Sequence, residues 1–505
     1  MKNITKTFGT IIANDQVSLD IRKGEILSLL GENGSGKTTL MNMLSGIYFP
    51  DSGQIFVDGR EVTISSPRDA FDLGIGMIHQ HFKLVDVFTA AENIVLGLGG
   101  RGRLDLKEVS RRVREICDRY GFEVDPQQLV CDMSVSQKQT LEIVKVLYRG
   151  ADILILDEPT AVLTPQETEK LFTVMRNMKA DGKAIVIITH KLHEVMEVSD
   201  RVAVLRKGKY IGDVATCDTD PQKLTDMMVG RSVKLNIDRP APVDPQDRLI
   251  VEHLSVKDKE GVTVLNDASF TLRSGEILGV AGISGSGQKE LLEAIAGLQH
   301  MEEGSAITYV DPDTGKHHQL VGLDPLQIRQ LGVHLSFVPE DRLGMGLVGT
   351  MGMTGNMMLK SYSNGSGPLL NRRPSTQLAN EIKDELEVVT PSINFPVRRL
   401  SGGNVQKVLV GREIAANPTV LMTAYAVRGL DINTSYTIYR LLNEQKQRGV
   451  AVLYVGEDLD VLLELADRIL VLCAGRISGI VDGPSVTKEQ VGLMMTHLNW
   501  KEADA

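Results

Sequence analysis

Short apolar runs recur along the chain, and each is followed by a stretch whose apolar positions have helical spacing. Three clear runs are residues 25–30 (EILSLL), 152–157 (DILILD) and 184–189 (AIVIIT). Near-continuous apolar strands that alternate with helices indicate a mostly parallel sheet covered on both faces. The pattern therefore predicts an α/β fold.

The pattern occurs twice. Residues 17–47 resemble residues 268–298 at a shift of 251 positions, whereas Asp200-Arg201 match Asp467-Arg468 at a shift of 267. The second copy thus holds 16 additional residues, which we expect between Glu340 and the segment that begins at Leu400. The proline-rich residues 237–247 predict a surface linker. We expect domains at residues 1–236 and 248–505.

Composition narrows the class of protein. The net charge of −10 disfavours a broad nucleic-acid-binding face. No run approaches the ~18 apolar residues that would span a bilayer, and the first ten residues lack the apolar core of a signal peptide. We expect a soluble protein whose four scattered cysteines are reduced thiols: Cys117, Cys131, Cys217 and Cys473.

A phosphate-binding loop follows the strand at residues 25–30. Its spacing is G-x-x-x-x-G-K-[ST], and a helix follows it, as this motif requires. Glycines let backbone N–H groups converge on phosphates, and the helix N-terminus favours anions. We expect Lys37 to contact the β- and γ-phosphates and Thr38 to bind Mg²⁺. The expected nucleotide-binding residues here are Gly31, Glu32, Asn33, Gly34, Ser35, Gly36, Lys37, Thr38 and Thr39.

Polar side chains also follow three other strands. Asp157 suits Mg²⁺ coordination and Glu158 suits a general base, although such a pair could also cap a helix. His190 ends the run at 184–189, where it is either a γ-phosphate sensor or a structural histidine. Gln80 follows a further strand-like run, and by itself it could be an ordinary loop residue.

Together these residues resemble the ABC transporter ATPases, and the resemblance covers essentially the whole chain in tandem. It implies two P-loop NTPase domains, each with a mostly parallel sheet and a helical signature subdomain, that use ATP and Mg²⁺. It implies that Phe8 stacks on adenine, although Phe8 could instead be a core residue of the first strand. Glu158 would be the catalytic base, His190 the switch histidine, and Gln80 the residue that links Mg²⁺ and water to the membrane subunit.

The family's cassettes dimerise head to tail, so each ATP lies between one phosphate loop and the other cassette's L-S-G-G-Q signature. The resemblance implies a pseudo-dimer within this one chain. The second half holds a close match to the signature, which could otherwise be an ordinary helix N-cap, and a matching D-loop aspartate. These expected nucleotide-binding residues are Ser401, Gly402, Gly403, Asn404 and Asp431.

The second nucleotide site departs from the pattern. Gln288 and Lys289 stand where the first half has Lys37 and Thr38, and the first half's signature reads Met133-Ser134-Val135-Ser136-Gln137. Val135 would obstruct close approach of a phosphate to the backbone. Further replacements are Ala424 for Asp157, Tyr425 for Glu158, Glu457 for His190, Glu340 for Gln80 and Thr164 for Asp431. We predict hydrolysis at one site, and whether the second binds nucleotide stays open.

The tandem pair with a short linker is most similar to importers of simple sugars and nucleosides, and residues 77–97 and 157–167 look closer to the nucleoside branch. The implied partners are two integral membrane permease subunits and, through them, an extracytoplasmic solute-binding protein, with this chain peripheral at the cytoplasmic face of the membrane. The alternative is a soluble tandem ABC ATPase acting on ribosomes or nucleic acid. The short linker, the single intact site and the acidic balance disfavour that alternative.

Overall fold

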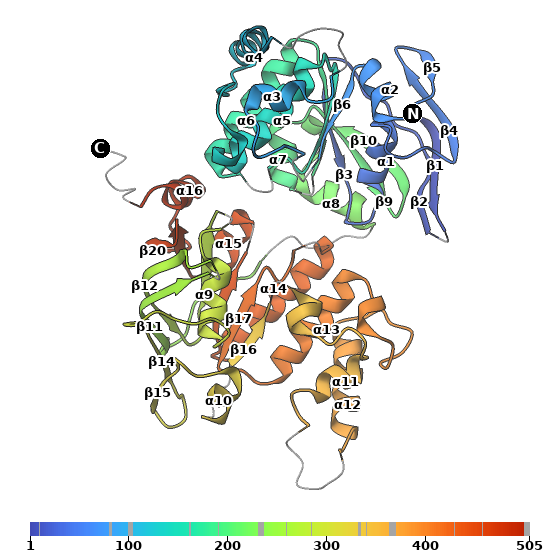
Figure 1. Ribbon diagram of the computed structural model, residues 1–505. Helices are drawn as coiled ribbons and strands as arrows, with labels where there is room; N and C mark the ends of the chain where they lie inside the picture. Colours follow the sequence, from blue (N-terminus) through green and yellow to red (C-terminus); the bar gives the residue numbers. More distant parts are fainter. Residues whose placement is uncertain are drawn as a thin grey trace. The chain divides into compact units, whose positions relative to one another are not determined.

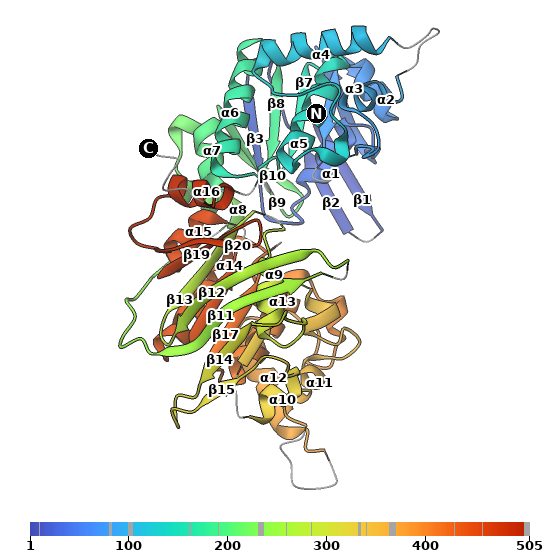
Figure 2. The ribbon, with the colours of Figure 1, turned by 60° about the vertical axis from the view of Figure 1, so that its left-hand side comes forward.

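The computed structural model (Figures 1 and 2) divides the chain into two compact units, residues 1–234 and 235–505. It describes residues 1–9, 11–79, 83–98, 105–160, 163–189, 191–230, 237–258, 260–283, 285–331, 335–339, 341–362, 370–428, 430–456 and 458–498. In this part of the chain no helix is long and apolar enough to cross a membrane.

The first unit is built on a six-stranded sheet in the order β10-β9-β3-β8-β7-β6, parallel except for β10. Its strands are β3 (Ile26–Leu30), β6 (Ile75–Ile78), β7 (Ile153–Asp157), β8 (Ala184–Ile188), β9 (Arg201–Arg206) and β10 (Lys209–Ala215). A smaller antiparallel sheet holds β2 (Ile11–Val17), β1 (Lys2–Phe8), β4 (Ser52–Val57) and β5 (Arg60–Val62) in that order. The fully buried runs of β3 and β8 explain the continuous apolar pattern of the sequence.

Helices of the first unit fall into two groups. Three of them pack on one another, as Figure 1 shows, and form a helical subdomain: α3 (Ala90–Val95), α4 (Leu106–Tyr120) and α5 (Val135–Tyr148). The others are α1 (Lys37–Leu44), α2 (Pro67–Asp72), α6 (Pro165–Ala180), α7 (Leu192–Val198) and α8 (Pro221–Val229), with 3-10 turns at Val130–Asp132 and Thr216–Asp218. Reciprocal capping boxes fix where α3, α5 and α6 begin.

The second unit repeats this architecture. Its six-stranded sheet has the order β16-β17-β18-β13-β19-β20, the counterpart strand for strand of the first. The strands are β13 (Ile277–Gly282), β16 (Leu335–Val338), β17 (Val420–Ala424), β18 (Ala451–Val455), β19 (Arg468–Cys473) and β20 (Arg476–Asp482). The antiparallel sheet contains β12 (Thr263–Arg273), β11 (Asp247–Lys257), β14 (Ala306–Val310) and β15 (His317–Gln319).

The helices of the second unit follow the same plan. They are α9 (Gln288–Ile295), α10 (Pro325–Gln330), α11 (Met353–Met358), α12 (Arg373–Glu385), α13 (Gly402–Ala415), α14 (Ile432–Gln447), α15 (Leu459–Leu465) and α16 (Lys488–Thr496), with a π turn at Arg342–Gly346 and a 3-10 turn at Val397–Arg399. Helices α11, α12 and α13 pack together as the helical subdomain. The predicted α/β fold with two tandem domains is thus confirmed.

Largely buried ion pairs occupy equivalent places in both units. Arg201 pairs with Glu25 at 2.7 Å, and Arg468 pairs with Glu276 at 2.5 Å. These pairs join the residue before the central strand to the start of the neighbouring strand. A polar arrangement kept with its partners in both halves is independent evidence for the duplication.

The additional residues of the second half are spread along the chain. The shift between the two copies is 251 at residues 17–47, and strand pairing relates β16 to β6 at a shift of 260. Nine of the 16 additional residues therefore precede β16, in the span that holds β14, β15 and α10. The expectation that all 16 lie between Glu340 and Leu400 is wrong for these nine. They lengthen connections between elements and leave the strand order of the larger sheet unchanged, which is how insertions are usually tolerated.

Residues 237–247 lie with the second unit. The side chain of Ile237 packs into that unit's core, and Arg239 donates hydrogen bonds to the carbonyls of Leu463 (2.7 Å) and Ala466 (3.0 Å). The start of the proline-rich segment is therefore held against the second unit by its own contacts.

Candidate nucleotide-binding sites

The loop between β3 and α1 has the shape of an anion cradle. Gly36 has φ 95°, and a Cβ there would lie 2.3 Å from the carbonyl oxygen of Ala13. Ser35 Oγ is buried without a hydrogen-bond partner among the described residues. No described side chain caps α1, so amides of its first turn are left for a ligand. These features fit a bound phosphate chain.

Lys37 lies at the start of α1 and folds back over this loop. Its buried ammonium donates to the carbonyls of Gly31 (2.7 Å) and Glu32 (3.0 Å). Burial lowers the pKa of Lys37, and the negative charges of Glu158 and Asp157 act in the opposite direction. A cation is thus held beside the cradle, as phosphate binding by this motif requires.

Asp157 ends β7 next to the same loop. Its carboxylate accepts a hydrogen bond from Thr38, while burial and the neighbouring Glu158 raise its pKa to about 6. A hydroxyl and a carboxylate that meet in this way offer the hard oxygen ligands that Mg²⁺ prefers. The donor set therefore fits the expected metal.

Glu158 follows with a strained backbone. Its φ is 49°, uncommon for a residue other than glycine, and its N–H donates to the carbonyl of Ile188 on the adjacent β8 (2.8 Å). The second unit keeps this geometry, because Tyr425 has φ 51° and donates to Val455 (2.9 Å). Only the side chain has changed, from a possible general base to a phenol.

A polar cluster that sequence reasoning missed holds the chain after Glu158. Thr160 donates to Glu194 (2.6 Å), and Lys191 pairs with Glu194 (3.1 Å) and donates to the Thr160 carbonyl (3.2 Å). Three residues of different character stand at the equivalent positions of the second half: Val427, Asp458 and Val461. This difference between the two copies could have indicated from the sequence that the first site has a polar cluster of its own.

We predict that Asp157→Asn stabilises the protein in the absence of Mg²⁺ and nucleotide. At pH 7.5 the folded state must carry a partly buried carboxylate whose pKa is raised to about 6, so removing the charge should increase the free energy of unfolding by about 1–3 kcal/mol. The gain should fade as the pH drops below 6, because folded Asp157 then takes up a proton. Thermal unfolding at pH 7.5 and 4.5 measures both effects.

The control for this prediction is Asp152→Asn, one residue before the other end of the same strand, where Asp152 is exposed and paired with Lys183 (2.7 Å). It should not stabilise the protein. A lower unfolding temperature for Asp157→Asn at pH 7.5 would contradict the argument.

For three other predicted site residues, the structure does not show a contact with the phosphate loop. Gln80 and His190 lie outside the described residues. Phe8 is 43% exposed at the end of β1 and packs edge-on against Tyr48 at 5.2 Å, so the alternative of a core residue is wrong. An exposed aromatic face is what stacking on adenine would require, and that role stays a prediction.

The signature segment opens α13 in the second unit. Ser401 is the N-cap residue, and its hydroxyl accepts from the backbone N–H of Asn404 (3.4 Å) and from its side chain (2.8 Å). Ser401 is thus a helix cap, as the alternative proposed, and capping leaves the bare amides of Gly402 and Gly403 at the helix start. Asp431 caps α14 and accepts from Thr434 at 2.8 Å.

The second phosphate loop keeps the backbone conformation of its last glycine, but the side chains after that glycine differ from those of the first loop. Gly287 has φ 98°, close to that of Gly36. Gln288 takes the place of Lys37, and its neutral amide donates to the Ile283 carbonyl at 3.1 Å. Glu290 lies in the first turn of α9 where the first half has Thr39, and it brings negative charge to the helix end that would otherwise favour an anion.

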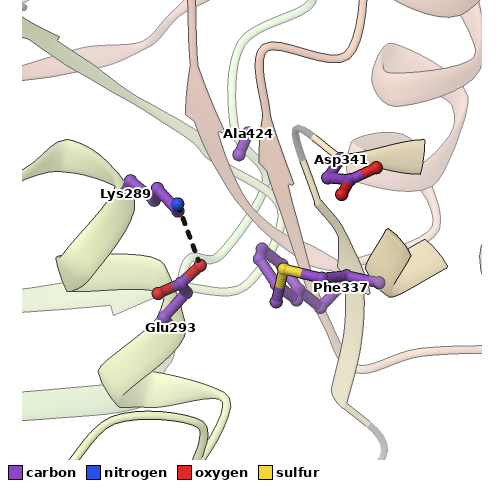
Figure 3. Close-up of a pocket in the computed structure, with 6 residues that line it drawn as sticks. Lys289, Glu293, Phe337, Asp341 and Ala424 are labelled. Atoms are coloured by element: carbon purple, nitrogen blue, oxygen red, sulfur yellow. Dashed lines mark ion pairs between the residues drawn. The ribbon is translucent and has the colours of Figure 1, made fainter. Parts of the chain in front are cut away.

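Lys289 points into a cavity of about 250 Å³, shown in Figure 3. It pairs there with Glu293 at 3.8 Å, one turn along α9. Ala424, at the position of Asp157, lines the same cavity with Phe337 and Asp341. The cation that replaces the Thr38 hydroxyl is therefore directed to a carboxylate of its own helix.

We predict that Lys289→Ala leaves most ATP turnover intact, whereas Lys37→Ala lowers it at least about a hundredfold. The reason is that Lys37 contacts the loop carbonyls where phosphates would bind, while Lys289 is paired with Glu293. Phosphate release by the two purified variants measures the difference. Equal losses would show that the second site contributes as much as the first.

The first unit's counterpart of the signature is an ordinary helix start. Ser134 and Gln137 form a complete capping box at α5, and the exposed Val135 is the first helical residue. Thr164, at the position of Asp431, caps α6 in the same way. These contacts explain why the segment folds as a helix start although it lacks the two glycines.

The sequence of this chain is similar to a known protein family and to several characterised relatives. The ABC transporter family matches residues 14–161 and 265–423. The guanosine import ATP-binding protein NupO of Bacillus subtilis is 44% identical over 100% of this chain and 98% of its own length. The nucleoside import ATP-binding protein NupA of Lactococcus lactis is 42% identical over 99% and 98%. The ribose import ATP-binding protein RbsA of Corynebacterium glutamicum is 38% identical over 97% and 91%.

Among solved structures, the archaeal ribosome recycling factor aABCE1, in complex with ribosomal stalk protein aP1, matches 95% of this chain and 90% of its own with a TM-score of 0.61. Its sequence identity is 16%, so this likeness concerns the fold alone. The family match, which falls once in each half, and the full-length relatives carry the assignment. This chain belongs to the ABC transporter family, and its two halves are ATP-binding domains of that family.

Proposed function

We propose that this chain is the ATP-hydrolysing subunit of an importer for nucleosides or simple sugars, and that one composite site powers it. The observation that carries the proposal is similarity over both halves and the full length to ATP-binding proteins named for guanosine, nucleoside and ribose import. The higher identities belong to the nucleoside and guanosine proteins, which favours a nucleoside as the solute.

In the proposed site, the first half supplies the phosphate loop and the second half the signature. Lys37 and the loop amides bind the phosphates. Thr38 and Asp157 would hold Mg²⁺, which would supply positive charge against the charge of the phosphates. Glu158 accepts a proton from the attacking water. Ser401 and the amides of Gly402 and Gly403 contact the γ-phosphate from the other side.

The distribution of substitutions supports this assignment. The residues suited to catalysis in the first half are a lysine, a threonine and two acids, and their second-half counterparts are Gln288, Lys289, Ala424 and Tyr425. The signature glycines show the reverse distribution, since they are kept in the second half and replaced by Val135 and Ser136 in the first. Independent decay of two equal sites would not sort the intact parts into a single combination.

The proposed partners are two integral membrane permease subunits and a solute-binding protein outside the membrane, with this chain peripheral at the cytoplasmic face. The test is purification from membranes of the native cell through a tag on this chain, followed by identification of the proteins that accompany it. We expect two integral membrane proteins in stoichiometric amount. Their absence in the nucleotide-free, ATP-bound and ADP-bound preparations would contradict the proposal.

An uptake assay then separates the candidate solutes. Cells that lack this chain should lose uptake of labelled guanosine or another nucleoside, and the wild-type chain, but not its Lys37→Ala variant, should restore it. Loss of ribose or glucose uptake with unchanged nucleoside uptake would assign the sugar branch. Unchanged uptake of all of them would contradict an import function for these solutes.

A further inference from the structure

A π turn follows β16 in the second unit. It spans Arg342–Gly346, and the N–H of Leu347 donates to the carbonyl of Arg342 at 2.7 Å. The carboxylate of Asp341 holds its start by accepting from the N–H groups of Leu343 (3.2 Å) and Gly344 (2.8 Å). Turns of this type are rare and often lie at functional sites, so its contacts are of interest.

One side chain of this turn contacts two segments of the proposed site. The partly buried guanidinium of Arg342 donates to the carbonyl of Gly402 (3.4 Å) and to the carbonyl of Arg428. Gly402 follows the signature serine, and Arg428 lies three residues before Asp431. A planar fork with several donors can hold two carbonyls at a fixed separation, which a flexible ammonium cannot do as well.

The far end of the same turn is fastened to the signature helix. Arg412 of α13 is buried and donates to the carbonyl of Gly346 at 2.7 Å, while it pairs with Glu413 at 2.8 Å. The turn therefore contacts both the first residue of α13 and a residue near its last turn. Its position and that of the signature are set together.

The first unit has a counterpart of the far contact, and the stretch that would correspond to the turn is shorter there. Lys145, the counterpart of Arg412, donates to the Lys83 carbonyl at 3.3 Å. The Asn93 side chain accepts a hydrogen bond from the Val85 N–H, and the Asn356 side chain accepts one from the Val348 N–H, each at 2.8 Å. Val85 and Val348 are therefore equivalent positions of the two halves. Between the strand end and these points the first half has six residues, 79–84, and the second nine, 339–347. The first-half stretch, His-Gln-His-Phe-Lys-Leu, contains no arginine.

We propose that three of the additional residues of the second half build this turn so that Arg342 can act as a positioning residue for the signature segment. Arg342 fixes the segment that begins at Ser401 and the loop that leads to Asp431 relative to each other. The half with the arginine is the half with an intact signature. This inference rests on the proposed role of that signature in completing the ATP site.

The test compares Arg342→Met, Arg342→Lys and the control Arg440→Met in the purified full-length chain. Arg440 is an exposed arginine of the same unit that pairs with Glu444 on α14. For Arg342→Met we expect kcat for ATP to fall by about ten- to a hundredfold through misplacement of the signature. The KM for ATP should change less than about twofold, because Lys37 and the first phosphate loop are untouched.

Arg342→Lys should recover part of kcat, since an ammonium can reach one of the two carbonyls, and Arg440→Met should match the wild type. The thermal unfolding midpoint should be the same for all four proteins. An unchanged kcat in Arg342→Met would overturn the proposal, and so would a fall in kcat that accompanies a lower unfolding midpoint in both Arg342 variants.

Glu158→Gln, measured in the same preparation, separates this inference from the proposed function. Turnover that survives Glu158→Gln would refute the proposed catalytic site itself. Turnover that is lost in Glu158→Gln and kept in Arg342→Met would refute the role of Arg342 alone.

Discussion

Glu158→Gln lowers ATP turnover by ~10²–10⁴, the range expected for loss of a general base. Glutamine has nearly the size of glutamate and can keep the backbone bond to the Ile188 carbonyl (2.8 Å), so the fold of the site should persist. What it loses is the ability to accept a proton from water. Phosphate release measures the loss, and binding of labelled ATP to the same sample should be unchanged because Lys37 and Thr38 remain.

The matched control is Tyr425→Phe, which acts at the equivalent backbone position of the second unit. Tyr425 has φ 51° against 49° for Glu158, and both donate to the neighbouring strand. If hydrolysis belongs to the first half's acid, removing the phenol hydroxyl should leave turnover within about twofold of the wild type. A large loss in Tyr425→Phe would place chemistry at the second site.

Gly403→Ser is expected to reduce turnover toward the upper end of the ~10²–10³ range for loss of transition-state stabilisation. The substitution copies Ser136 of the first half into the intact signature. Among the described residues outside its own helix, the atom nearest to a Cβ at Gly403 would be Asp431 Oδ2 at 3.6 Å, so the second unit should fold normally. The loss would come from a side chain placed where the γ-phosphate must approach the backbone. Phosphate release and thermal unfolding, measured on the same protein, separate these effects.

The reciprocal change, Ser136→Gly, makes the first half's segment more like a signature. It should not raise turnover, because the site that this segment would serve has Ala424 and Tyr425 instead of two acids. If Gly403→Ser retained normal turnover, the signature of the second half would not take part in hydrolysis. The proposal of a composite site would then be wrong, even if Glu158 proved essential.

Much of the fold could be predicted because its signals are local. The runs at 25–30, 152–157 and 184–189 became β3, β7 and β8, and the loop after β3 has the geometry that its glycines predicted. The offset of the two copies also identified Gln288 as the residue in the place of Lys37, and both side chains do contact loop carbonyls. Spacing along the chain carries this kind of information directly.

Contacts between distant residues could not be predicted in the same way. The cluster of Thr160, Lys191 and Glu194 joins residues about one strand and one helix apart, and no single-sequence pattern announces it. Phe8 lies where β1 turns into β2 and pairs with Ile11, and apolar character alone does not specify that its side chain is exposed there. The Lys289–Glu293 pair is different, because it joins residues one turn apart on α9 and follows from helical spacing.

We expect each chain to have one hydrolytic site, built around the first half's phosphate loop and acids. Orthovanadate, which takes the place of the γ-phosphate after hydrolysis, traps ADP only at a site that has turned over. The most direct measurement is the number of ADP molecules trapped per chain with vanadate and Mg²⁺, using a photoreactive adenine to locate the bound half. We expect one ADP per chain, cross-linked to the first unit. Two per chain, or one cross-linked to the second unit, would contradict it.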